Sequence, residues 1–391
     1  MQLRKEGSIM ERLKNIVIIW GKDGSNPLGL LRQIHDYAEV IFLLLGRDMN
    51  CATRSRFCKK VHKTQSLEQG LEWLLSNFST VEYKPFILTT GDMVAEYVDN
   101  YKDLLEPLFH ITGTKEKGLL TTVLDKNVMC KLASRMGFDV PVSVQFKWNS
   151  DISEISYPCL LKPDKNHINH KKDFKTKICY SKADLQETLK SVSRDSVFVL
   201  QEYIQKDSDS LIYGCRTSSG KTIVAGMLIK KRWDEKGDGS YGFLTGEIPE
   251  FIKLDLIENF LAEVGYTGLF SVEYALKGAT AYFMEFNLRN DGTSHYFYQA
   301  GVNIPMIWIL DTLGKDYSEF RQRVQGKKEF MSITDDYINV KNGVVSKSEW
   351  KNERKKATIF RYKDRSDMAP HYWHIAMEKL INVYGKIRRI I

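Results

Sequence analysis

The first third of the chain alternates between continuous apolar runs and segments whose apolar residues recur at helical spacing. Asn15–Trp20, Val40–Leu45 and Pro85–Thr89 are short runs rich in β-branched and other apolar residues, which is typical of buried parallel strands. Leu28–Tyr37 has the spacing of an amphipathic helix. Strands that alternate with helical segments predict a small doubly wound α/β domain over about residues 14–110.

The middle of the chain continues with further strands and helices. Tyr157–Pro163, Val197–Ile204 and Thr222–Arg232 are apolar segments of strand length. Leu120–Gly137 and Leu254–Gly265 carry apolar residues at helical spacing and end on a glycine, which predicts two helices.

Less regular segments complete the pattern. Gly237–Gly246 contains four glycines and predicts a flexible loop. Ala300–Asp311 is apolar and predicts a core helix. Residues 312–391 are more polar and end in a helix, His371–Tyr384, with a basic end. We expect this tail to pack on the core, with homodimer formation and contact with a membrane surface as alternatives.

A polar row on an otherwise apolar hairpin is the most informative feature of the sequence. Phe270–Leu276 and Thr280–Arg289 predict two strands joined by a short turn. A period of two places Glu285, Asn287 and Arg289 on one face of the second strand. If the hairpin turns about Ala279, Glu273 of the first strand lies opposite Glu285.

Two facing carboxylates repel each other unless a cation lies between them. Glu273 and Glu285, together with the amide oxygen of Asn287, are hard oxygen ligands of the kind that Mg²⁺ takes when it is shared with phosphates. Arg289 is placed to bind those phosphates as a fork. The competing interpretation is a solvated polar face, but apolar residues on both sides of this strand argue against it.

Several basic residues are further candidates for anion binding. Lys162 interrupts an apolar strand, so it is expected to be buried and paired with an anion. Lys126, on a predicted helix, is uninformative by itself. Lys230 and Arg232 share one face of a strand and either bind a substrate carboxylate or protect a sheet edge; spacing favours neither. Asp164–Lys177 is rich in lysine and either covers phosphates or is a solvated loop.

Composition restricts the classes of function. The 391 residues are 43% hydrophobic and 27% charged, as in ordinary globular proteins, and the net charge of +8 suits anionic partners. The six cysteines lack CxxC spacing, which predicts free thiols in a reducing cytoplasm. The polar start of the sequence predicts no secretory signal, and no apolar run approaches the length of a membrane span. The aromatics are not interleaved with the basic segment at the spacing expected for nucleic-acid binding.

Along the chain, a lysine on a helix and a lysine in an apolar strand come first, then a strand ending in QEYI, and finally Glu273 followed by Glu285-x-Asn287-x-Arg289. The order of these features resembles the ATP-grasp superfamily. The resemblance is to the carboxylate–amine ligase branch that includes D-aspartate ligase. It implies an α/β fold in which two α+β subdomains grip ATP, preceded by a Rossmann-like domain. The implied domains are residues 1–110 (Rossmann-like), 111–195 (small ATP-grasp subdomain), 196–311 (catalytic subdomain) and 312–391 (helical tail).

The resemblance also implies a role for individual residues. Glu273, Glu285 and Asn287 would ligate Mg²⁺, expected as two ions and replaceable by Mn²⁺, and Arg289 would stabilise the transferring γ-phosphoryl group. The implied ATP-binding residues are Lys126 and Lys162 for the phosphates, Gln201, Glu202, Tyr203 and Ile204 for adenine, and Asp209 for the ribose. Family members commonly cover the phosphates with a glycine-rich loop; here the corresponding segment has no glycine, so a side chain such as Lys177 would make that contact.

The function implied is ATP-dependent joining of a small-molecule carboxylate to an amine. The carboxylate is activated as an acyl phosphate, which requires positioning and charge neutralisation but no side-chain nucleophile. Two alternatives stay open. One is activation of bicarbonate, as in carboxylases and carbamoyl-phosphate synthases. The other is an ATP-binding protein without catalysis.

Overall fold

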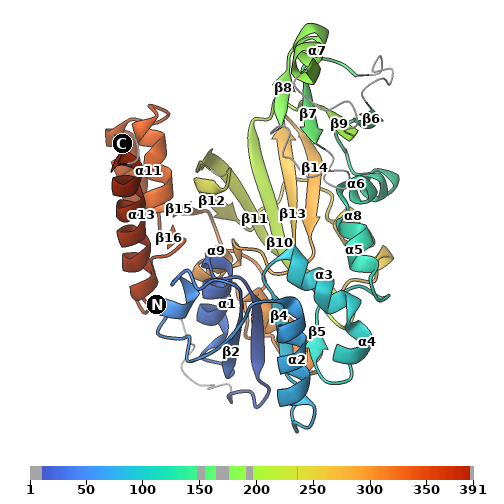
Figure 1. The fold of residues 1–391 in the computed structure, drawn as a ribbon, viewed down its shortest axis with the longest axis vertical. Helices are drawn as coiled ribbons and strands as arrows, with labels where there is room; N and C mark the ends of the chain where they lie inside the picture. The colour runs from blue at the N-terminus through green and yellow to red at the C-terminus, as the bar shows by residue number, and fades with distance from the viewer. Residues whose placement is uncertain (1–10, 148–154, 164–175, 191–196, 236, 388–391) are drawn as a thin grey trace.

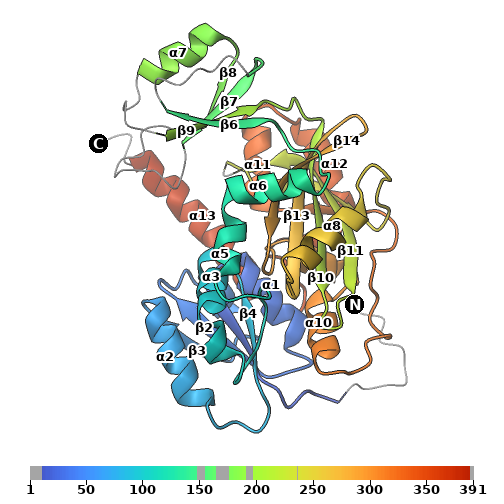
Figure 2. The same ribbon diagram turned by 90° about the vertical axis from the view of Figure 1, so that its right-hand side faces the viewer.

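A computed structural model describes residues 11–147, 155–163, 176–190, 197–235 and 237–387. Its strands form three sheets: a five-stranded parallel sheet near the N-terminus, a four-stranded sheet, and a seven-stranded sheet that carries the second half of the chain. Figures 1 and 2 show the five-stranded sheet at one end of the molecule and the four-stranded sheet at the other, with the seven-stranded sheet between them.

The N-terminal sheet has the order β3-β2-β1-β4-β5, with all neighbours parallel. Its strands are β1 (Val17–Gly21), β2 (Val40–Leu45), β3 (Lys60–Thr64), β4 (Phe86–Thr89) and β5 (His110–Ile111), and its helices are α1 (Ser25–Ile34), η1 (Ala52–Arg54), α2 (Leu67–Phe78), α3 (Asp92–Asn100) and α4 (Lys102–Leu105). The central strand β1 is buried at every position because α1 covers one face of the sheet and α2 and α3 cover the other. This double cover explains the continuous apolar runs.

The helix expected over Leu120–Gly137 is two helices, α5 (Leu119–Leu124) and α6 (Lys126–Arg135). Asp125 separates them because its backbone is extended, with ψ of 122°. Its carboxylate accepts hydrogen bonds from the backbone N–H groups of Asn127 (2.9 Å) and Val128 (3.1 Å). Asp125 therefore caps α6 and places Lys126 in its first turn.

The four-stranded sheet has the order β6-β9-β7-β8 and is antiparallel. It consists of β6 (Ser143–Lys147), β7 (Cys159–Pro163), β8 (Lys177–Cys179) and β9 (Val197–Glu202), with α7 (Lys182–Lys190) packed on it. The core of this part is small and includes Phe146, Leu161, Phe198 and Leu200. Residues 164–175, most of the predicted basic loop, lie outside the described residues.

The seven-stranded sheet has the order β14-β13-β10-β11-β12-β15-β16. Its members are β10 (Ser208–Arg216), β11 (Thr222–Trp233), β12 (Gly239–Thr245), β13 (Gly268–Lys277), β14 (Thr280–Asn287), β15 (Lys328–Met331) and β16 (Ile359–Phe360). One face packs on α8 (Leu254–Glu263) and α6, and the other on α9 (Ser294–Gln299) and α10 (Ile304–Thr312). The apolar cluster on the second face continues through α1 into the parallel sheet, so the two sheets share one core.

Strand β12 occupies most of the segment that was expected to be a flexible loop, and that prediction is wrong. The glycines there allow close backbone approach within the sheet. A Cβ on Gly242 would lie 2.0 Å from the carbonyl oxygen of Ile229 on β11. Glycine inside a strand often marks such an approach, and here it was mistaken for a loop signal.

The tail over residues 312–391 contributes both helices and strands. It forms α11 (Ile333–Lys341), α12 (Lys347–Lys356) and α13 (Ala369–Ile387), and it adds β15 and β16 to the sheet. Asp367 pairs with Arg32 of α1 at 3.0 Å, with both side chains buried, which ties the tail to the N-terminal sheet. The boundaries at residues 110, 195 and 311 stay predictions. No described helix is both long enough and apolar enough to cross a membrane.

Candidate active site

The hairpin of β13 and β14 places the predicted acidic residues opposite each other. Glu273 pairs in register with Glu285, and Ser271 with Asn287. The turn differs from the expected one, because Lys277 pairs with Thr280 and Gly278 takes a φ of 56°. The register then shifts between Tyr274, which faces Phe283, and Glu273. Met284 is therefore the extra residue of a β-bulge, and this bulge brings Glu285 opposite Glu273.

The bulge also explains why both odd-numbered and even-numbered apolar residues of β14 lie in the core. Phe283 and Phe286 are both buried, with ring centroids 5.5 Å apart. Phe286 stacks on Phe260 of α8 at 4.2 Å. Because one extra residue switches the alternation of the strand, these two side chains face the helices while Glu285 faces the cavity on the other side.

Each of the two carboxylates has a lysine partner. Lys126 Nζ lies 2.8 Å from Glu285 Oε2, and Lys230 Nζ lies 3.1 Å from Glu273 Oε2. Burial is the largest single effect and lowers the pKa of both lysines, but the charge of the paired carboxylate, the hydrogen bond to it and further negative groups together outweigh burial, so the net pKa of each lysine is raised. The site therefore holds two pairs of oppositely charged side chains, and the members of each pair are in direct contact.

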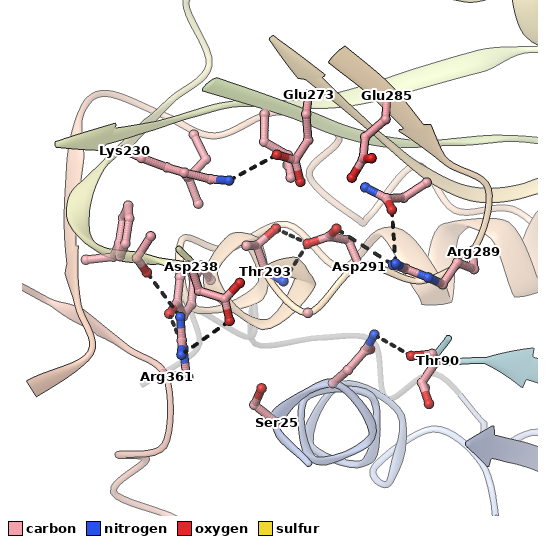
Figure 3. Close-up of a pocket in the computed structure, with 18 residues that line it drawn as sticks. Ser25, Thr90, Lys230, Asp238, Glu273, Glu285, Arg289, Asp291, Thr293 and Arg361 are labelled. Atoms are coloured by element: carbon pink, nitrogen blue, oxygen red, sulfur yellow. Dashed lines mark hydrogen bonds and ion pairs between the residues drawn. The ribbon is translucent and has the colours of Figure 1, made fainter. Parts of the chain in front are cut away.

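Beyond Glu285, the row continues out of the strand and into a loop. Strand β14 ends at Asn287, and Arg289 Nη2 donates to Asn287 Oδ1 at 3.0 Å. Asn287 Nδ2 donates to Ser271 Oγ at 3.2 Å, and this hydroxyl donates to Asp291 Oδ2 at 2.9 Å. Figure 3 shows Asp291 between Thr293 and Arg289, below the two glutamates. Asp291 was missed, although it continues the spacing of two from Arg289.

The donor set is suited to a hard divalent cation. Burial raises the pKa of Glu273; Lys230 lowers it, and Asp291 and Glu285 raise it further. A cation between these oxygens would relieve that crowding of negative charge. No described cluster of three or more His, Cys, Asp or Glu side chains is arranged to hold a metal by itself. Two carboxylates and an amide fit Mg²⁺, which completes its shell with phosphate oxygens and water.

The four-stranded sheet contributes the second predicted lysine. Lys162 of β7 donates to Gln201 Oε1 on β9 at 2.6 Å, and Gln201 Nε2 donates to Ser143 Oγ at 2.9 Å. Burial, followed by the charge of Lys126, lowers the pKa of Lys162. The two lysines are thus close enough to repel each other, which is the arrangement expected of two cations that share one anion.

The predicted adenine segment connects two sheets. Gln201 and Glu202 end β9, and Tyr203 and Ile204 lead toward β10. Backbone hydrogen bonds run from Glu202 N to Val142 O (2.8 Å) and from Tyr203 N to Pro158 O (3.3 Å), so the segment is fixed on both sides.

The remaining predicted nucleotide contacts lie further out. Asp209, at the start of β10, accepts from Lys206 Nζ (2.7 Å) and Trp233 Nε1 (2.9 Å). Lys177 is exposed at the start of β8; the pKa of Glu187 on α7 is lowered mainly by its hydrogen bond to Lys190 and by the charge of Lys190, and only slightly by Lys177. The structure therefore brings Lys177 into no contact with the glutamate pair.

Spacing left a carboxylate fork and a protected sheet edge open for Lys230 and Arg232, but in the structure the two side chains form no common fork, and β11 has a neighbouring strand on each side. The pairing of β11 is irregular between these two residues, so their side chains diverge. Arg232 forms two hydrogen bonds to Asp336 of α11 (3.1 and 2.8 Å) and lies 2.7 Å from Glu353 of α12. It is 8% exposed and helps to hold the tail on the sheet.

A cavity of about 330 Å³ opens next to the glutamate pair. The hairpin and the loop after it supply one side, with Glu273, Glu285, Asn287, Arg289 and Asp291. The N-terminal domain supplies Ser25 and Asn26, in the first turn of α1 after β1, and Thr90, directly after β4. The order in which strands are added to the sheet reverses between β1 and β4, and α/β folds commonly bind ligands at such a point. That position could have been read from the sequence.

The tail supplies a cavity residue that no sequence signal indicated. Arg361, just after β16, lines the cavity opposite the parallel sheet (Figure 3). Its guanidinium donates to Tyr296 Oη (3.2 Å), Gly239 O (3.1 Å) and Asp335 Oδ2 (3.1 Å). Asp238 lies 4.0 Å away and also lines the cavity. Arg361 is 72 residues from Arg289 in the chain, so only tertiary contacts bring the two to one cavity.

The sequence matches no family model and no curated protein. The structure is similar to N5-carboxyaminoimidazole synthetase from Staphylococcus aureus complexed with ADP (TM-score 0.64, 14% identity, 82% of this chain and 83% of that chain). It is also similar to L-amino acid ligase from Bacillus licheniformis (0.59, 13%, 79% and 77%). A third similar structure is the biotin carboxylase domain of a thermophilic 2-oxoglutarate carboxylase bound to ADP (0.56, 14%, 81% and 74%).

At such low identity these similarities concern the fold. They extend over about four fifths of the chain. The predicted fold class is confirmed: the chain has the ATP-grasp fold, preceded by a Rossmann-like domain.

Proposed function

We propose that this protein is an ATP-dependent ligase that activates a small-molecule carboxylate as an acyl phosphate and joins it to an amine. The observation that carries the proposal is the facing pair Glu273 and Glu285, which pair with Lys230 and Lys126 and line one cavity together with Lys230 and Arg289. Such a concentration of opposite charges is what transfer of a phosphoryl group requires. The shared fold supports it, because the similar structures include a synthetase and a ligase.

Each group has a defined task in this proposal. Lys126 of α6 and Lys162 of β7, whose mutual repulsion a phosphate would relieve, would bind the ATP phosphates from two sides. The segment 201–204 contacts adenine, Asp209 the ribose, and Lys177 reaches the phosphates. Glu273, Glu285 and Asn287 would hold Mg²⁺, which neutralises phosphate charge and acts as a Lewis acid when bound.

Arg289 would orient the γ-phosphoryl group toward the carboxylate in the cavity. The carboxylate oxygen bonds to phosphorus as ADP leaves. The nitrogen of the neutral amine then bonds to the acyl carbon and loses a proton to solvent, and phosphate leaves with the electron pair of the broken C–O bond. Throughout both steps, the side chains of the protein position the reacting groups and neutralise the charge of the phosphates. Homodimer formation and a cytoplasmic location stay predictions.

Bicarbonate is the second candidate acid. Two of the similar structures are an N5-carboxyaminoimidazole synthetase and a biotin carboxylase domain, and these names favour it specifically. ATP hydrolysis that depends on bicarbonate, without any other acid, would support this candidate over an organic carboxylate.

The proposal is tested by phosphate release from ATP and Mg²⁺ in the presence of panels of acids and amines. Turnover is expected only with matching pairs, and hydroxylamine should trap the acyl phosphate as a hydroxamate. We expect Glu285→Gln to lower turnover at least a hundredfold, because one negative ligand is lost where charge develops. The matched control is Glu263→Gln, an exposed glutamate at the end of α8, which should behave as wild type.

Two results would refute the proposal. One is wild-type turnover in Glu285→Gln that is folded as judged by its unfolding temperature. The other is ATP binding without hydrolysis in every panel, which would favour the non-catalytic alternative.

A further inference from the structure

The side chain of Arg289 is held from three directions. Its Nε donates to Asp92 Oδ1 at 2.8 Å, Nη2 donates to Asn287 Oδ1 at 3.0 Å, and Nη1 donates to the carbonyl oxygen of Asn290 at 3.2 Å. Within the described chain, these bonds engage three of the five N–H groups of the guanidinium. One N–H on each of the two Nη atoms makes no hydrogen bond to the described residues, although Nη1 also lies 3.9 Å from Asp291 Oδ2; a guanidinium can bind an anion as a fork through two such N–H groups.

Asp92 comes from a different part of the chain from Arg289. It is the first residue of α3 and lies three residues after the carboxyl end of β4. Asp92 is therefore the only one of the three contacts that the N-terminal domain supplies to this guanidinium. Thr90, two residues earlier, lines the cavity, so the segment that bonds Arg289 is also a wall of the cavity.

The loop that carries Arg289 is itself docked on the N-terminal domain. Asn290 N donates to Thr89 O at 3.3 Å, and Asn26 Nδ2 donates both to Asn290 O (2.9 Å) and to Thr90 O (3.2 Å). These bonds fix the loop backbone relative to β4. The Asp92 carboxylate then fixes the direction of the side chain.

We propose that Asp92 is a positioning residue, which orients Arg289 so that its two Nη groups face the transferring phosphoryl group. The inference rests on the proposed function, since Arg289 is the phosphoryl-binding arginine there. Asp92 is half exposed and the ion pair is at the surface, so its effect on stability is small. Its effect on phosphoryl transfer is larger, because a small misplacement of a catalytic group costs up to about a hundredfold in rate.

The test compares two ligands that differ at the phosphoryl position. ADP with Mg²⁺ lacks the group that Arg289 contacts, whereas ADP with Mg²⁺ and aluminium fluoride carries a mimic of it. We expect Asp92→Ala to weaken binding of the aluminium fluoride complex on the order of tenfold and to leave ADP binding unchanged, as measured by calorimetry. Asp92→Asn should lie between Asp92→Ala and wild type, because its amide oxygen still accepts from Nε.

The matched control is Asp103→Ala. Asp103 is an exposed carboxylate in the same domain and pairs with Lys117 at 2.9 Å. It should change neither affinity. The unfolding temperature should be the same for both variants within experimental error, which separates positioning from a structural role.

Three outcomes are decisive in different ways. If wild type does not bind ADP with Mg²⁺, the proposed function fails and this inference with it. If wild type binds both ligands and Asp92→Ala binds them equally well, only the role of Asp92 is overturned. Equal weakening of both ligands by Asp92→Ala also overturns it, because positioning of the phosphoryl group predicts a selective loss.

Discussion

The buried ion pair between Arg32 and Asp367 makes a strong prediction about stability. Asp367 Oδ2 accepts from Arg32 Nε (3.0 Å) and from Ser55 Oγ (2.7 Å), and Oδ1 accepts from the backbone N–H of Arg56 (3.0 Å). Both charged side chains are 1% exposed. The substitution Asp367→Asn keeps the shape of the side chain but removes the negative charge.

The expected cost follows from what remains around Arg32. Two carbonyl oxygens still accept from Nη2, those of Tyr362 (3.0 Å) and Asp367 itself (2.8 Å). His295 Nε2 lies 3.3 Å from Nη1, but burial and the charge of Arg32 lower the pKa of His295 to about 3, so it is neutral and supplies no charge. A buried charge that loses its partner costs about 3–5 kcal/mol. Whole domains are stable by only about 5–15 kcal/mol.

Urea unfolding followed by circular dichroism measures this loss. The control is Asp316→Asn, because Asp316 accepts hydrogen bonds from Ser318 N (2.9 Å) and Oγ (2.6 Å) in an exposed turn. We expect the control to change the free energy of unfolding by less than about 0.5 kcal/mol. A loss below about 1 kcal/mol in Asp367→Asn would refute the reasoning. Adding Arg32→Met to Asp367→Asn should recover part of the loss, since the unpaired charge is then gone.

Two further predictions concern basic residues. Because burial and Lys126 lower the pKa of Lys162, its charge is lost as pH rises through a value below the usual 10.5. The kcat/KM for ATP should therefore fall at alkaline pH in wild type and stay flatter in Lys162→Arg, whose guanidinium remains charged; identical pH profiles would contradict this. Arg232→Met should destabilise the protein by about 3 kcal/mol through its contacts to Asp336 and Glu353. It should leave the KM of both substrates unchanged, and a selective rise of one KM would return Arg232 to the site.

Much of the fold was predictable because its local patterns agree with its tertiary surroundings. Val40–Leu45 was expected as a strand with the bounds that it has, since a strand covered on both faces is apolar throughout. The helix at Leu254–Glu263 likewise has one apolar face and ends before a glycine. Gly242 misled the prediction, because a glycine required by a close strand contact looks the same in sequence as a glycine in a loop.

The candidate site was predictable where its residues lie on one hairpin. Glu273 and Glu285 are twelve residues apart and face each other, as the alternation of strands indicated. The turn is one residue shorter than expected, and the bulge at Met284 restores the register that places Glu273 opposite Glu285. Neither feature is evident from residue spacing. Arg232 shows the limit of reasoning from alternation. An irregular pairing between Lys230 and Arg232 is enough to turn the Arg232 side chain away from the side that Lys230 faces.

The sequence by itself determined many of the strands and helices and the acidic row, because these depend on local periodicity and on neighbours close in the chain. It also determined which residue types were available for phosphates and a cation. Only the tertiary structure decided that Asp92 meets Arg289, that Arg361 lines the same cavity, and that Asp367 secures Arg32. These contacts join residues between 72 and 335 positions apart. They follow from how sheets and helices pack on a shared core, and no periodicity within one segment records that packing.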